Sequence, residues 1–424
     1  MNAAKDFPAA LKALRDDTLR RVASRLEADY SPREKVALAS SAKESTTQVY
    51  LAGDGAVAWS AVRSAQIDLQ ELILPGTFTS SAQAPCEKFS LIDHLKTVVD
   101  DCYSILSSYF SITCEGCEAE ESSAHTALNL VQSLPDLRSR TQWNIFASLK
   151  DPAVWDAYTL RTEGHRQRLS QLSLIPEIDA SIQKRDMNHY RNFLEEQDFR
   201  EAFGYQIELV RRVYPGWRAL LHHSIANCLA AAKPDKENGI QPVPTPFLPR
   251  LIVEESAKEF QADLHPETEI GDANFLDHPH RGITTGQTGK IGVGCLIYPC
   301  TLGGVTDKVK QRHPLIGNHV LIGTDVGVFG PVGVGDHSVI GPNCEISGFV
   351  DFGENVKVRA AAVLRTVPSP NSRPGRLIVE KNSTIGEEAL ILNDHSSDLV
   401  LPEGSVIPAH SHVVNDGEGR PRVI

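Results

Sequence analysis

The chain has 424 residues, which predicts more than one domain, because single hydrophobic cores stop growing at about 250–300 residues. Its formal charge of −12 argues against binding to nucleic acid or to an acidic membrane surface. No apolar run approaches the roughly 18–20 residues of a membrane span, and the N-terminus lacks an apolar signal core, so we expect a cytoplasmic protein. The eight cysteines are scattered, which favours free thiols in a reducing compartment.

Residues 1–233 carry the apolar periodicity of helices, and the clearest amphipathic segment covers 91–105. Ser90 is placed to cap this segment, since an acidic residue follows three positions later. Five prolines then break the helical pattern between residues 233 and 249. Because proline removes a backbone donor and blocks a helix, we predict an all-helical domain over 1–233 and a proline-rich linker over 234–261.

A six-residue apolar period organises the C-terminal part of the chain. Neither the 3.6-residue repeat of a helix nor the two-residue repeat of a strand explains this period. It is typical of the hexapeptide β-helix, in which one aliphatic side chain per short strand points into a narrow core. Glycine follows five of the apolar positions, where we expect it to adopt corner angles that other residues resist. The clearest run is Ile316, Ile322, Val328, Val334, Ile340, Ile346, Phe352, Val358 and Leu364.

Weaker traces of the same period begin near Ala262 and continue to Val413. We therefore predict an α+β chain, in which a helical domain is followed by a left-handed parallel β-helix over 262–424. The period is lost between Gly303 and Pro314, where a polar stretch predicts a loop thrown out from the coil. Long loops on a rigid scaffold often carry function.

Three segments of the predicted β-helix hold the residues with chemistry. They are DLHPETEIGDANFLDHPHRGITTGQT at 263–288, CTLGG at 300–304 and QRHP at 311–314. As a set they resemble serine O-acetyltransferases, whose pattern is D-I-H-P, L-D-H-x-T-G-x-x-x-G-E-T, T-L-G-G and R-H-P. Weaker similarity covers residues 133–154 and 213–226, and the region near 155–205 between them is longer than the family pattern.

The resemblance implies transfer of acetyl from acetyl-CoA to the hydroxyl of L-serine, which gives O-acetylserine for cysteine synthesis. His278 would be the general base, because a free alcohol is a poor nucleophile near neutral pH and needs a base with a suitable pKa. Asp263 would orient the imidazole of His278, and His313 would be the second active-site histidine. Backbone amides would stabilise the oxyanion.

The resemblance also implies the binding residues. Arg312 would hold the serine carboxylate, and Asp277 and Asp151 would bind its ammonium group. The site would lie between subunits of a homotrimer or of a dimer of trimers. It implies no metal and no permanently bound cofactor, with acetyl-CoA as cosubstrate. The candidate acetyl-CoA contacts are backbone at Gly304 and Thr324 and the cations Lys308 and Lys310, with Arg359 and Arg365 as further cations.

Three departures from the family pattern leave alternatives open. HPHRG has one residue more than the family turn, His280 competes with His278 as the base, and Gln287 replaces the usual glutamate. The first alternative is an acyl-CoA transferase that acts on homoserine or another amino alcohol. The second is a non-catalytic β-helix subunit that scaffolds or regulates an active partner.

The remaining motifs have structural or partner-binding interpretations. Cys114 and Cys117 form a lone C-x-x-C, and since zinc would need a second pair, we expect no metal there. His222 and His223 are expected to be packing or subunit-contact residues. In this family a terminal isoleucine often enters the active site of O-acetylserine sulfhydrylase, and Ile424 fits that role. The same tail also resembles the closing coil of other hexapeptide transferases.

Overall fold

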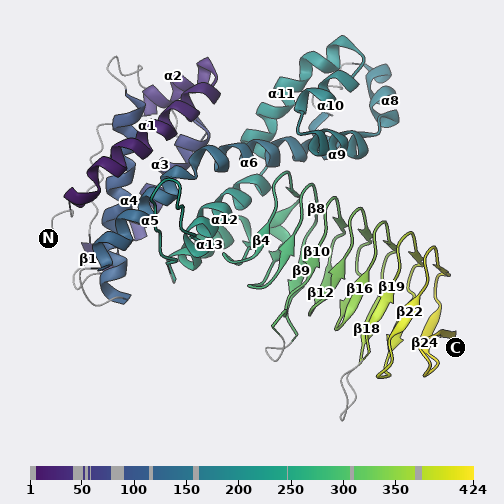
Figure 1. Cartoon of the computed structure of the whole chain (residues 1–424). Helices are drawn as coiled ribbons and strands as arrows, with labels where there is room; N and C mark the ends of the chain where they lie inside the picture. Colours follow the sequence, from purple (N-terminus) through teal and green to yellow (C-terminus); the bar gives the residue numbers. More distant parts are fainter. Residues whose placement is uncertain are drawn as a thin grey trace. The chain divides into compact units, whose positions relative to one another are not determined.

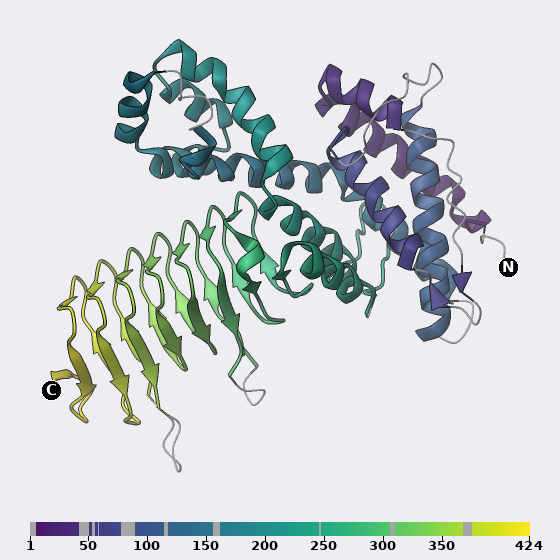
Figure 2. The same ribbon diagram turned by 180° about the vertical axis from the view of Figure 1, so that it is seen from behind.

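The computed structural model describes residues 6–41, 51–52, 56–57, 59–77, 90–113, 118–155, 162–245, 247–305, 310–367 and 375–424. The chain divides into two compact units, Met1–Ser139 with Ser224–Ile252, and Arg140–His223 with Val253–Ile424 (Figures 1 and 2). This division differs from the predicted domains, because Arg140–His223 packs with the strands rather than with the first helices. No helix in the described ranges is long and apolar enough to cross a membrane.

The first unit is built from helices, as its periodicity predicts. Asp93 N donates to Ser90 Oγ at 3.3 Å, so the expected N-cap of the 91–105 segment is present. Helices α6, α12 and α13 continue from this unit into the second. The elements are η1 (Ala9–Leu11), α1 (Lys12–Asp29), α2 (Pro32–Ser41), β1 (Leu51–Ala52) paired with β2 (Ala56–Val57), α3 (Trp59–Ile73), α4 (Leu91–Thr113), α5 (Glu118–Gln132), α6 (Leu134–Ala147), α12 (Gly216–Ala230) and α13 (Leu248–Phe260).

Helix α13 lies inside the segment predicted to be a linker, so residues 248–260 are helical where the proline content predicted irregular backbone. Pro249 sits in the first turn, where its missing N–H needs no helical partner, and it therefore permits the helix instead of breaking it.

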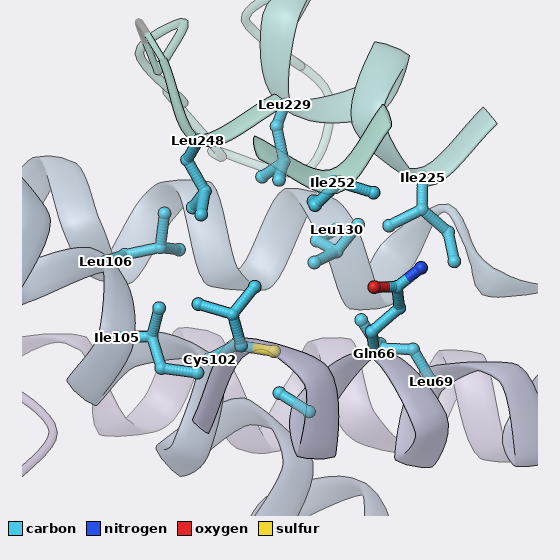
Figure 3. A pocket seen from close by; sticks show the side chains of 12 residues that line it. Gln66, Leu69, Cys102, Ile105, Leu106, Leu130, Ile225, Leu229, Leu248 and Ile252 are labelled. Atoms are coloured by element: carbon cyan, nitrogen blue, oxygen red, sulfur yellow. The ribbon is translucent and has the colours of Figure 1, made fainter. Parts of the chain in front are cut away.

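Helices α3, α4, α5, α12 and α13 enclose a small apolar cavity in the first unit (Figure 3). Gln66 contributes an amide group to a lining that otherwise consists of aliphatic side chains and Cys102. The cavity volume is about 40 Å³. Because ordinary small-molecule sites span roughly 300–1,000 Å³, we assign this cavity no ligand.

The helices of the second unit are η3 (Ser148–Lys150), α8 (Glu163–Gln171), α9 (Leu174–Lys184), α10 (Met187–Phe193) and α11 (Gln197–Val213). They are held together by aromatic side chains. The Tyr190 ring lies 6.1 Å from Phe146 and 6.2 Å from Trp155, in edge-to-face geometry. Such pairs stabilise beyond their buried area, so the region near 155–205 is a folded lobe in its described parts.

The strands form a parallel β-helix with three sheets stacked coil on coil (Figures 1 and 2). Sheet 1 contains β4 (Glu269–Ile270), β7 (Lys290–Ile291), β10 (Leu315–Ile316), β13 (Gly333–Val334), β16 (Val350–Phe352), β19 (Leu377–Val379) and β22 (Leu399–Leu401). Sheet 2 contains β5 (Phe275–Leu276), β8 (Leu296–Ile297), β11 (Leu321–Ile322), β14 (Val339–Ile340), β17 (Lys357–Val358), β20 (Thr384–Ile385) and β23 (Val406–Ile407). Sheet 3 contains β3 (Ala262–Asp263), β6 (Ile283–Thr284), β9 (Cys300–Gly303), β12 (Val326–Phe329), β15 (Glu345–Ser347), β18 (Val363–Thr366), β21 (Leu390–Asn393), β24 (His412–Asn415) and β25 (Pro421–Val423).

The predicted six-residue period is confirmed in the packing of the coils. Ile316 pairs in register with Val334, and Val334 pairs with Phe352, so three six-residue steps complete one coil. All nine side chains of the run are buried in one continuous core. Along this run the core therefore receives one apolar side chain from each sheet at every coil.

The expected role of the glycines is wrong, because they provide space rather than corner angles. A Cβ on Gly317 would lie 2.4 Å from Asp336 Oδ1, and one on Gly335 would lie 2.4 Å from the backbone of Gly353. The left-handed corner angles belong instead to residues such as His319 (φ 54°) and His337 (φ 60°). Close stacking of neighbouring coils is thus what excludes a side chain at the glycine positions.

The C-terminal strand closes the β-helix. β25 pairs antiparallel with β24, and Ile424 N donates to His412 O at 3.0 Å. This arrangement agrees with the closing-coil interpretation of the tail.

Candidate active site

His278 stands at the corner between β5 and β6, which belong to sheets 2 and 3. Its backbone is left-handed (φ 49°), and it caps the 3₁₀ turn η4, Pro279–Arg281. The longer HPHRG segment is accommodated by this turn. The imidazole is 63% exposed, and its Nε2 lies 3.7 Å from Asp277 Oδ1. An exposed ring beside a carboxylate can accept a proton from a bound molecule.

The structure gives His278 neighbours other than those predicted. Its ion-pair partner in the described chain is Asp277, and the ring of His280 stands 5.7 Å away. Asp263 lies at the end of β3 and aligns in register with Thr284 at the end of β6. His278 lies six residues before Thr284, so it precedes the strands of sheet 3, whereas Asp263 lies at their C-terminal ends. The pairing of Asp263 with His278 stays a prediction.

A second group of residues surrounds His313, which precedes β10. Thr288 Oγ1 accepts from the backbone N–H groups of Arg312 (3.0 Å) and His313 (3.2 Å). Thr288 N also donates to His313 Nδ1 at 3.3 Å, and Thr288 Oγ1 lies 3.0 Å from the same nitrogen. Since Thr288 Oγ1 already accepts twice, its own hydrogen points to Nδ1. The neutral ring therefore carries its proton on Nε2.

The environment of His313 keeps its ring neutral and close to backbone. Burial first, and then the charges of Arg312 and His265, lower the pKa of His313. A Cβ on Gly286 would lie 2.0 Å from His313 Nε2, and one on Gly304 would lie 3.0 Å from it. The imidazole is thus seated on glycine backbone, and Nε2–H is available as a hydrogen-bond donor.

Arg312 belongs to a short series of hydrogen-bonded polar side chains beside His313. Arg312 Nη2 donates to Gln287 Oε1 at 3.4 Å, and Gln287 Nε2 donates to Glu267 Oε2 at 3.0 Å. The amide at 287, where the family pattern has glutamate, therefore bridges a cation and a carboxylate. A glutamate at 287 could not donate to Glu267.

Asp151 and Asp277 form an acidic pair beside His278. Burial raises the pKa of Asp277, and the negative charge of Asp151 raises it further, while His278 lowers it. Tyr214 OH donates to Asp151 Oδ2 at 2.5 Å. The burial of Tyr298 and the charges of Asp277 and Asp151 raise the pKa of that tyrosine. A carboxylate such as Asp277, whose charge is destabilised by a second carboxylate, favours a bound cation.

No family model matches the chain. The serine acetyltransferase of Synechococcus elongatus is 32% identical over 170 residues, which cover 39% of this chain and 57% of that protein. The serine acetyltransferase of Mycobacterium tuberculosis is 33% identical over 134 residues, or 31% of this chain and 53% of that protein. The chain thus spans little more than half the length of these two relatives. The serine acetyltransferase of Helicobacter pylori (strain 26695) is 32% identical over 135 residues, or 32% of this chain and 72% of that protein.

The chain belongs to the serine acetyltransferase family. Among solved structures, serine acetyltransferase 1 of Entamoeba histolytica in complex with L-cysteine aligns at a TM-score of 0.47 and 20% identity, over 81% of this chain and 97% of that chain. A TM-score below 0.5 carries no conclusion about this chain.

The residues expected to bind acetyl-CoA are only partly described. Gly304 is exposed beside His313, and Thr324 O accepts from Asn343 N at 2.9 Å. Lys310 is exposed, and Lys308 lies outside the described residues. Of the other cations, Arg359 is exposed and Arg365 lies 3.1 Å from Glu345. Cys114 and Cys117 also lie outside the described residues, and in the ranges that are described no group of His, Cys, Asp or Glu could hold a metal ion.

Three further residues of this candidate site are not singled out by the sequence motifs. Thr288 ends the G-Q-T segment, and Tyr214 begins the Y-P-G segment, so motif membership could have identified both. Tyr298 follows β8 in a sequence without a motif, and only its position beside Asp277 reveals it.

Proposed function

We propose that the protein is an acetyl-CoA:L-serine O-acetyltransferase. The observation that carries this proposal is an exposed imidazole, His278, 3.7 Å from the Asp277 carboxylate of the acidic pair. Such a pair attracts the ammonium group of an amino acid and places its hydroxyl near a base. The match over the region that carries these motifs supports serine as the acceptor.

The reaction is a direct transfer. Asp277 and Asp151 bind the ammonium group, and Arg312 binds the carboxylate. The serine hydroxyl attacks the thioester carbonyl while His278 takes its proton, and backbone amides stabilise the oxyanion. The tetrahedral intermediate collapses to O-acetylserine and CoA thiolate, which is protonated by His278. His313 serves as a neutral donor through Nε2–H.

We infer that one site is completed by two subunits. His278 lies between a strand of sheet 2 and a strand of sheet 3, and His313 lies between a strand of sheet 3 and a strand of sheet 1. In one chain the two histidines are therefore at opposite ends of the sheet 3 strands. A neighbouring β-helix would bring the His278 corner of one subunit beside the His313 corner of the next, as in a homotrimer or a dimer of trimers. Acetyl-CoA would lie in the same cleft along Gly304 and Thr324, with Lys310 and Lys308 near its phosphates.

The partner and the location stay predictions. Docking of Ile424 into O-acetylserine sulfhydrylase would require the β24–β25 pairing to open, since Ile424 N is bonded to His412 O. Deletion of the last residues should then abolish sulfhydrylase binding. The cytoplasmic location is supported by the scattered cysteines of the chain.

The test is release of CoA thiol by the purified full-length protein with L-serine or L-homoserine. We expect turnover with serine, and a His278→Ala loss of about 100- to 10,000-fold in kcat, the usual contribution of a general base. His280→Ala is the matched control, because its ring is an exposed neighbour of His278. Preference for homoserine would establish the first alternative, and no turnover with either would favour the non-catalytic subunit. Full activity in His278→Ala would exclude this base.

A further inference from the structure

The lobe near 155–205, by which this chain exceeds the family pattern, contacts the β-helix through a buried ion cluster. The Oδ1 atom of Asp179, on α9, lies 2.6 Å from Nζ of Lys150 and 3.0 Å from Nδ1 of His319. The Lys150 side chain is only 1% exposed, and that of His319 is 6% exposed. A buried ammonium without a counter-ion is strongly unfavourable, so Asp179 is what permits Lys150 to lie there.

The coil corner is shaped to receive this cluster. Lys150 Nζ also donates to Gly294 O at 2.5 Å. A Cβ on Gly294 would lie 2.5 Å from His319 Nδ1, so the corner leaves no room for a side chain at that position. The ring of His319 stacks on His337 at 5.0 Å, with 6° between the planes. The end of η3 is therefore attached to the β-helix and to α9 at one point.

This attachment point is adjacent in the chain to Asp151 of the acidic pair. Lys150 is the last residue of η3, and Asp151 follows it directly. Asp151 Oδ1 accepts from Ala153 N at 2.9 Å, and Oδ2 accepts from Tyr214 OH, which comes from the end of α11. The Tyr214 ring in turn stands 6.0 Å from Phe275, two residues before Asp277. Both ends of the inserted lobe thus bear on Asp151. Lys150 fixes the backbone directly before it, and Tyr214 bonds its carboxylate.

We propose that the inserted lobe is a positioning element for the acceptor's ammonium subsite, and that Asp179 is its positioning residue. By pairing with Lys150 and packing against His319, Asp179 locks η3 onto the coil corner and holds Asp151 beside Asp277. This inference rests on the proposed function for the identity of the acceptor, but the placement of Asp151 can be measured without turnover.

The kinetic test compares Asp179→Asn with Asp272→Asn. The control removes a different contact between the C-terminal end of α9 and the β-helix, since the Asp272 carboxylate accepts from Arg185 at 2.6 and 2.9 Å. We expect Asp179→Asn to raise the KM for L-serine about tenfold, as small misplacements of binding groups do, with the KM for acetyl-CoA unchanged. The preference for L-serine over 3-hydroxypropanoate, which lacks the ammonium group, should fall by a similar factor. Asp272→Asn should change neither quantity.

Hydrogen–deuterium exchange of residues 148–155 supplies the readout that does not need activity. In the wild type, Asp151, Ala153, Val154 and Trp155 donate their amides within this segment, and Ala153 donates to the Asp151 carboxylate itself. Asp179→Asn should speed their exchange at least tenfold, and Asp272→Asn should leave it unchanged. If Asp179→Asn unfolds, Lys150→Met/Asp179→Leu replaces it, because it leaves no unpaired buried charge, and the same faster exchange is expected.

The two hypotheses fail in different ways. A wild type that does not acetylate serine overturns the proposed function, while the exchange of 148–155 still decides the placement of Asp151. Unchanged exchange in Asp179→Asn, or equal effects of Asp179→Asn and Asp272→Asn, would overturn the positioning role of Asp179.

Discussion

The hydroxyl of Thr288 lies 3.0 Å from Nδ1 of His313 and, by accepting from the amides of Arg312 and His313, is committed to donate to that nitrogen. One threonine therefore sets both the backbone of the Arg312–His313 pair and the tautomer of the imidazole. Because burial also lowers the pKa of His313, the ring is a neutral Nε2–H donor around pH 7.

Thr288→Val should impair the enzyme without unfolding the coil. Valine has a similar shape but no hydroxyl, so Nδ1 loses a donor and the Arg312 and His313 amides lose their acceptor. We expect kcat/KM for serine to fall about 10- to 100-fold, on the order of one to two lost hydrogen bonds to a partly buried group. Thr288→Ser, which keeps the hydroxyl, should retain most of the activity. Equal steady-state kinetics for the valine variant and the wild type would contradict this role.

Serine binding should weaken in acid because of Asp277. Its pKa is raised by burial and by Asp151, so the carboxylate takes up a proton at a higher pH than an ordinary aspartate does. Above that pKa it is ionised and binds an ammonium group, and below it the charge is lost. The KM for serine should therefore rise as pH falls through this pKa. Asp277→Asn should have a KM at least about tenfold higher, with a weaker acid dependence. A wild-type KM for serine that does not rise as the pH is lowered through the pKa of Asp277 would contradict the role of Asp277 in binding the ammonium group.

Replacing Gln287 by glutamate should be tolerated only if Glu267 is replaced by glutamine at the same time. Gln287→Glu removes the donor to Glu267 and places two carboxylates in contact, which draws Arg312 away from the substrate. We expect the serine KM to rise about two- to fivefold, because the group is exposed and such pairs contribute about 0.2–1 kcal/mol. Glu267→Gln combined with Gln287→Glu restores the donor, the acceptor and the net charge, and should recover the loss. Additive effects in this double-mutant cycle would show that the two side chains act independently.

The free energy of unfolding should decrease in mild acid because of two buried histidines. Burial lowers the pKa of His222 and of His223 to about 4, whereas an unfolded histidine titrates at about 6.5. Between these values the unfolded chain binds protons that the folded chain does not, so stability is full above about pH 6.5 and is lost as pH falls toward 4. His223→Gln, which keeps a donor toward His265 O (3.2 Å in the wild type), should flatten this dependence by roughly 1–3 kcal/mol.

Thermal or urea unfolding at several pH values measures this effect. The exposed residue His280 supplies the control, since His280→Gln should leave the profile as it is in the wild type. An identical profile in His223→Gln would mean that His223 is not among the groups that destabilise the fold in acid.

The sequence alone determined the β-helix, because each coil is a local repeat. Ile316, Val334 and Phe352 meet in the core through steps that the chain itself counts, and no distant segment has to arrive for the pattern to be visible. The family could likewise be identified from contiguous motifs, and with it the residues around His278 and His313. The sequence misled where a residue type has two uses, as with the glycines that provide space and with Pro249, which lies in the first turn of α13.

Only the tertiary structure decided which distant residues meet. Nothing in the spacing of Lys150, Asp179 and His319 indicates that one carboxylate lies beside both side chains, nor that Tyr214 holds Asp151. The tautomer of His313 depends on Thr288, twenty-five positions earlier in the chain. Hydrogen bonds and buried charges depend on distance and direction in space, which are set only when helices and coils pack. A periodic core, in contrast, follows directly from the order of the residues along the chain.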